Sequence, residues 1–74
     1  MTAYEKTQMK IVAASMKHPP LHGPIIGGGM ISVTIPNDVH RIVDAVAALH
    51  AASVDGDVQV TIRGDQVTLA MYID

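Results

Sequence analysis

The last part of the chain alternates apolar and polar residues, and this pattern is typical of a β-hairpin with one buried face. The two alternating segments, residues 58–63 and 66–73, are separated by Gly64-Asp65. This pair suits a two-residue type II′ turn, which needs glycine at its first central position. The predicted register then sets apolar residues opposite one another: Ile62 with Val67, Val60 with Leu69, and Val58 with Met71.

A strand and a helix precede this hairpin. Residues 30–35 alternate and are rich in β-branched side chains, so they predict a strand that ends at Pro36. Asn37 is a suitable N-cap for a helix over residues 38–52. Large apolar residues recur at helical spacing on one face of this helix: Val39, Ile42, Val43, Val46 and Leu49. The opposite face carries a stripe of mostly small residues: Arg41, Ala45, Ala48 and Ala52.

The first seventeen residues predict a helical arm. Thr2 and Glu5 have the spacing of a capping box, and good helix formers follow them. The alternative is a strand over residues 9–16, whose alternation is poor. Residues 18–29 then predict an extended loop rich in proline, glycine and histidine, since Pro19, Pro20 and Pro24 lack backbone donors.

These elements predict one α+β domain over residues 1–74, with a β-α-β-β core at 30–74. The order is helix, strand, helix and hairpin (α-β-α-β-β). A strand–helix–strand connection normally joins parallel strands, and the hairpin adds an antiparallel one. We therefore expect a three-stranded mixed sheet with both helices on one face.

Composition excludes several classes of function. The chain of 74 residues has no cysteine, which removes thiol chemistry and thiolate metal sites. Five basic residues and two tyrosines do not supply the basic, aromatic surface of a nucleic-acid-binding protein. No apolar run approaches the roughly 18–20 residues of a membrane span, so a cytoplasmic location is expected. No convergent acid–base pair is evident, so we expect no enzyme activity.

The residues with the best claim to ligand or partner contact lie in the predicted loop: His18, His22, Gly27, Gly28 and Gly29. Glycine backbone N–H groups beside histidine are suited to a small anion. A phosphate loop, however, needs a strand before the glycines and a helix after them, and here a strand follows. The two loop histidines lack a third ligand, so no metal or other cofactor is expected.

A second set of residues is expected to form an interface. Charged residues are only 16% of the chain, which leaves few to solvate the small-residue stripe of the helix and the second face of the sheet. The candidates are Met30, Arg41, Ala45, Ala48, His50, Ala52, Ala70 and Tyr72. Arg41 and the alanines could equally receive the N-terminal helix of the same chain, while His50 interrupts the apolar face of its helix.

Taken together, the sequence favours a small non-enzymatic binding or regulatory protein that acts as a homo-oligomer, with a dimer favoured. It would contact another protein in the manner of an inhibitor or adaptor, such as those of phages and mobile elements. The alternative is a protein that binds and sequesters a small molecule or nucleotide, with its site at the glycine-rich loop and a subunit interface.

Overall fold

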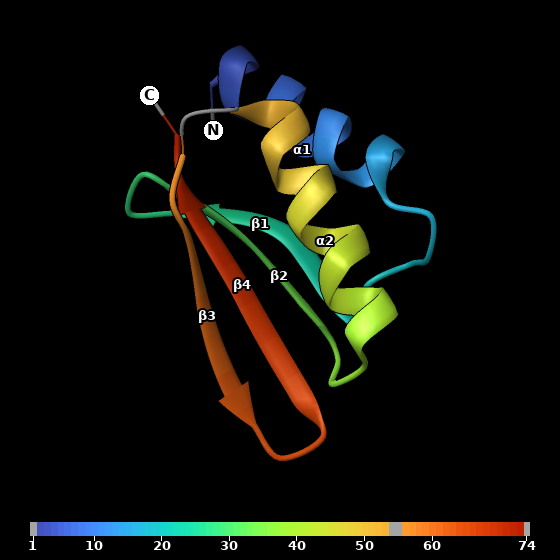
Figure 1. The fold of residues 1–74 in the computed structure, drawn as a ribbon. Helices are drawn as coiled ribbons and strands as arrows, with labels where there is room; N and C mark the ends of the chain where they lie inside the picture. The colour runs from blue at the N-terminus through green and yellow to red at the C-terminus, as the bar shows by residue number, and fades with distance from the viewer. Residues whose placement is uncertain (1, 54–55, 74) are drawn as a thin grey trace.

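The computed structural model of this chain describes residues 2–53 and 56–73 and has an α+β fold. Its helices and strands follow one another in the order α1, β1, β2, α2, β3, β4. Both helices lie on the same side of a single four-stranded sheet (Figure 1). The predicted fold class is therefore confirmed, with one strand more than the sequence indicates.

Helix α1 spans Ala3–Ser15 and begins with the predicted capping box. The Thr2 backbone N–H donates to Glu5 Oε1 at 2.9 Å, and the Glu5 backbone N–H donates to Thr2 Oγ1 at 3.1 Å. Such bonds satisfy backbone N–H groups that the first turn of a helix leaves without partners. The alternative strand over residues 9–16 is therefore wrong, and α1 packs alongside α2 and β1.

The strands pair in the order β1-β2-β4-β3, and every neighbouring pair is antiparallel. Their bounds are His22–Gly27 for β1, Met30–Pro36 for β2, Val58–Arg63 for β3 and Gln66–Tyr72 for β4. β2 and β3 run in the same direction, as expected across a strand–helix–strand connection, but β4 lies between them. The prediction of a three-stranded mixed sheet is wrong in both respects.

Strand β1 occupies part of the segment that the sequence predicts as a loop. It lies at an edge of the sheet, and its register against β2 shifts between His22 and Ile25. An edge strand tolerates Pro24, which lacks a backbone N–H, because one side of the strand has no neighbouring strand to hydrogen-bond with. Gly23 has a φ of 91°, and a Cβ there would lie 2.7 Å from the Ser32 carbonyl oxygen. This irregular backbone conceals the alternation by which a strand is recognised.

The β3–β4 hairpin has the predicted register at each of its apolar pairs. Gly64 in its turn has a φ of 60°, whereas Asp65 does not have a positive φ. That combination is the type II′ turn expected from the sequence. The hairpin prediction is therefore confirmed in pairing and in turn type.

Helix α2 spans Val39–Ala52 and begins a residue later than predicted. Its N-cap is Asp38, whose carboxylate accepts a hydrogen bond from the Arg41 backbone N–H at 3.1 Å. Asn37, the predicted N-cap, instead donates through its side chain to the Gly64 carbonyl oxygen at 3.1 Å. Asn37 thereby joins the start of α2 to the turn of the β3–β4 hairpin.

The buried face of α2 is rotated from the face that the sequence predicts. Ala45, Ala48 and Leu49 are fully buried, whereas Val39 and Val43 are exposed. The alanines allow α1 and the sheet to approach α2 closely, since packing distance depends on side-chain size at the contact. The core therefore contains Leu49 from the predicted apolar stripe of this helix and Ala45 and Ala48 from the predicted small-residue stripe.

The core lies between the helices and the sheet. Branched residues from β2 and β4 interdigitate there with α1 and α2, and the buried set is Val12, Ile31, Val33, Ile35, Ala45, Ala48, Leu49, Val67, Leu69 and Met71. β3 contributes no fully buried residue to this set. β1, the other edge strand, contributes none either, so the two edge strands are the parts of the sheet that the core does not enclose.

Candidate functional site

Four branched apolar side chains, two on β3 and two on α2, are at least half exposed on the side of the sheet that carries the helices. Val60 and Ile62 on β3 are 50% and 62% exposed, and Val39 and Val43 on α2 are 65% and 64% exposed. We call these residues the α2–β3 surface. Leu69, directly opposite Val60 on β4, is fully buried. The exposure of Val60 therefore reflects a missing cover and not the wrong face of the strand.

The position of α2 explains this exposure. α2 packs on β2 and β4, whereas β3 packs chiefly against β4 (Figure 1). Ile35, Val67 and Ile62 form a row across β2, β4 and β3, and exposure rises only at the last member of the row. Other large apolar residues are exposed elsewhere in the chain, at Tyr4, Leu21, Ile25 and Tyr72. Val60 and Ile62 differ from them because they lie on the core side of the sheet, which makes them candidates for an interaction site.

The backbone of β3 also faces solvent along one edge. In a hairpin with a two-residue turn, the residues that flank the turn exchange hydrogen bonds, and such pairs alternate along the strands. Gln59, Thr61 and Arg63 therefore direct their N–H and C=O groups toward β4. Val58, Val60 and Ile62 direct theirs to the free edge, where another strand is able to pair with them.

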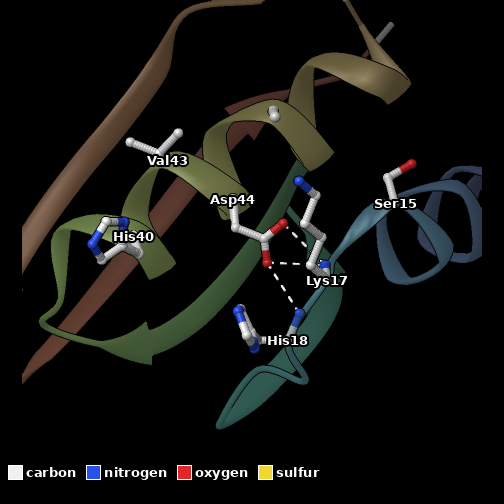
Figure 2. Close-up of a pocket in the computed structure, with 7 residues that line it drawn as sticks. Ser15, Lys17, His18, His40, Val43 and Asp44 are labelled. Atoms are coloured by element: carbon white, nitrogen blue, oxygen red, sulfur yellow. Dashed lines mark hydrogen bonds between the residues drawn. The ribbon is translucent and has the colours of Figure 1, made fainter.

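A pocket of about 360 Å³ lies between the C-terminal end of α1 and the outer side of α2 (Figure 2). It is lined by Ser15, Lys17, His18, His40, Val43, Asp44 and Ala47. The Asp44 carboxylate accepts hydrogen bonds from the Lys17 N–H at 3.0 Å and the His18 N–H at 3.1 Å. Asp44 thereby holds the segment that leaves α1 against the side of α2.

The wall of this pocket is more apolar than polar, and its polar groups come from a few side chains. Asp44 is occupied by backbone donors, which leaves Lys17, His18 and His40 to meet a ligand. Within residues 2–53 and 56–73, no three histidine or carboxylate side chains are placed to hold a metal ion. Lysine and histidine side chains are hydrogen-bond donors, which is the chemistry that an anionic group requires.

The glycines and histidines expected to share a ligand lie at different ends of β1. Gly27 ends β1, and Gly28 and Gly29 form the tight turn into β2, with φ of 60° and 76°. His22 begins β1, and His18 precedes it. A strand rises about 3.3 Å per residue, so roughly 17 Å separate the two ends. One chain therefore does not bring His18 and the glycines into a common site.

The predicted interface residues are distributed over three environments. Ala45 and Ala48 are buried within this chain, Ala52 packs against the core, and Arg41 is half-buried. The small-residue stripe of α2 is therefore covered by other elements of the same chain. His50 is half-buried, and its Nε2 lies 3.2 Å from the Gly56 carbonyl oxygen. Met30, Ala70 and Tyr72 lie on the sheet face away from the helices, where Met30 pairs with the 60% exposed Tyr72.

The sequence did not single out the α2–β3 surface. Its members belong to patterns that predict a core, and nothing in the alternation of β3 distinguishes it from β4. Finding this surface requires knowing which strands of the sheet a single helix is wide enough to cover. The alternation of apolar and polar residues along a strand does not contain that information.

Comparison with protein-family models, with curated proteins and with solved structures found no match to this chain. Neither helix in the described part of the chain has the length and apolar character needed to cross a membrane.

Proposed function

We propose that this chain is a small, non-enzymatic, cytoplasmic binding protein that acts as a homo-oligomer, with a dimer favoured, in the manner of an inhibitor or adaptor. The observation that supports the proposal is the α2–β3 surface, where four branched apolar side chains of β3 and α2 are at least half exposed. Its contacts with other proteins would use the surfaces that the fold leaves uncovered.

The free energies of burial and of association favour a partner that covers several of these side chains together. Burying the exposed half of one valine or isoleucine contributes about 1 kcal/mol. Association costs about 4–15 kcal/mol in lost rotational and translational freedom. A contact with one of these residues is therefore insufficient, whereas a partner that covers the whole surface and also pairs with the β3 backbone supplies a favourable balance.

The test is the molar mass in solution. Sedimentation analysis over a micromolar concentration range is expected to give a mass above the 7.8 kDa of one chain. Ile62→Lys, on the α2–β3 surface, is expected to shift the protein toward the monomer because it puts a charge among apolar groups. Thr61→Lys is the matched control, on the same strand but the other face of the sheet. A wild-type protein that remains monomeric throughout would contradict the proposal.

A second candidate function is the binding of a small anionic molecule. The observation that favours it is the pocket that Lys17, His18 and His40 line beside the occupied Asp44 carboxylate (Figure 2). Native mass spectrometry of freshly purified protein would then show a co-purified ligand. Titration with inorganic phosphate is expected to move the NMR signals of His18 and His40 but not those of His22, and unchanged signals would remove this candidate.

A further inference from the structure

The free edge of β3 is suited to one partner in particular. Resting on the proposed homo-oligomer, we propose that two copies join β3 to β3 in antiparallel fashion about a two-fold axis at Val60, forming one continuous sheet. Because of the two-fold axis, both copies contribute the same strand to the contact. A residue that follows Val60 by a given number of positions therefore lies opposite the residue of the second copy that precedes Val60 by the same number.

The two edges of the sheet differ in how well they admit another strand. β1, at one edge, contains Pro24 and a register shift between His22 and Ile25. Proline and irregular backbone are devices that prevent strand addition. β3, at the other edge, has neither proline nor lysine and pairs without a break along β4. The edge of the sheet that is open to pairing is therefore β3.

The apolar residues of β3 select the register. An axis at Val60 places Val60 opposite Val60 of the second copy, and Val58 opposite Ile62. Each of these residues directs its N–H and C=O groups to the free edge, so about six new backbone hydrogen bonds would form. Moving the axis to Gln59 or Thr61 would set Ile62 opposite Gly56 or Val58 opposite Gly64, and apolar contact would be lost.

Charge gives an independent reason for the same register. Asp57 and Arg63 flank the apolar residues at the two ends of β3 and are both exposed. An axis at Val60 places Asp57 opposite Arg63 of the second copy, and the symmetry repeats this pair at the other end. Opposite charges in directly facing strand positions are favourable, and like charges are unfavourable. An axis at Thr61 would instead set Asp57 opposite Asp65.

Joining the edges also has a consequence for the apolar surface. Val58, Val60 and Ile62 of both copies would lie side by side on the helix side of the joined sheet. α2 of each copy packs on β2 and β4 and therefore lies to either side of this strip. Two separate α2–β3 surfaces thereby become one apolar trough across the centre of the dimer.

Charge exchange tests the register without altering the core. Asp57→Arg sets arginine against arginine, and Arg63→Asp sets aspartate against aspartate. Each variant alone is expected to weaken self-association about tenfold, since two attractive pairs become repulsive. The double variant is expected to restore it. A mixture of the two single variants is expected to form mixed dimers in preference to either homodimer, because every facing pair is then opposite in charge.

Crosslinking is the second measurement. The chain has no cysteine, so Val60→Cys introduces a single thiol. Directly opposed Cα atoms in a hydrogen-bonded antiparallel pair are about 5.5 Å apart, within the range that a disulfide spans. Val60→Cys is therefore expected to give a covalent dimer on oxidation. Ile62→Cys is the control, because its two copies would lie roughly 13 Å apart along the strands.

The outcomes separate this inference from the proposed function. A protein that is dimeric, but neither crosslinks through Val60→Cys nor responds to charge exchange at Asp57 and Arg63, overturns β3 pairing and leaves the homo-oligomer in place. A protein that is monomeric at every concentration overturns both. Circular dichroism of each variant verifies that the single chain is still folded.

Discussion

β3 and β4 are two strands of one hairpin, with the same alternation and the same buried-side orientation, but only β4 is enclosed. Val67, Leu69 and Met71 on β4 are fully buried, while their partners on β3 are half-buried or exposed. The difference arises because β4 lies between two strands and beneath α2, whereas β3 lies at the edge. Alternation therefore determines which face a residue occupies, and the position of the helices determines whether that face is covered.

The largest expected effect comes from comparing truncations at Leu69 and Val60, which lie opposite each other on β4 and β3. Leu69→Ala removes a fully buried side chain and is expected to lower the free energy of unfolding by about 2–5 kcal/mol. Val60→Ala, its neighbour on β3, is expected to lower it by about 1 kcal/mol or less at low protein concentration. Urea denaturation measures both. Equal losses would mean that β3 is covered within the single chain.

A smaller effect is expected from enlarging a residue where α2 packs. Ala48 is fully buried, so Ala48→Leu forces the surrounding core apart and is expected to cost about 1–3 kcal/mol. Ala51, on the exposed side of the same helix, is the matched control. Ala51→Leu is expected to change thermal stability by less than about 0.5 kcal/mol. Similar shifts for the two variants would count against the observed rotation of α2.

Removing the carboxylate that joins the helices is expected to have a local effect. Asp44→Ala leaves the Lys17 and His18 N–H groups without their acceptor and is expected to cost about 1 kcal/mol. Amide hydrogen exchange at these two positions is expected to accelerate, while exchange at the Leu69 amide, in the interior strand β4, is expected to change less. Unchanged protection of both Lys17 and His18 would show that Asp44 does not hold this segment.

The smallest effect concerns pH. The pKa of Glu5 lies below its usual value of 4.5, chiefly because its carboxylate accepts a hydrogen bond from the Thr2 backbone N–H. The resulting stability is present above about pH 4.5 and is lost as the pH falls through the lowered pKa. Glu5→Gln lacks this dependence, so its denaturation midpoint and that of the wild type are expected to converge in acid. Lys10→Gln, on the same helix, is expected to retain the wild-type profile.

The parts of the fold that the sequence predicts well are those whose determinants are local. The Gly64-Asp65 turn and the alternation on either side of it define the hairpin register, and Thr2 with Glu5 defines the start of α1. The orientation of α2 is not local. Ala48 is buried because α1 and the sheet approach it, although Val43 is the more apolar side chain.

The candidate site is less predictable for the same reason. β1 contains Pro24 and an irregular register, which remove the local signal of a strand. Without β1, the width of the sheet and the place of α2 above it are not defined by the sequence pattern. The exposure of Val60 and Ile62 follows from that width, so it becomes visible only in three dimensions.

The interior position of β4 has a consequence for how the protein folds. β4 follows β1, β2, α2 and β3 along the chain, yet it is the strand that joins β2 to β3. Before β4 pairs, β3 has no neighbouring strand and β2 has only the irregular β1. Two apolar strands therefore lack a partner until β4 joins both of them, which makes completion of this sheet a cooperative event.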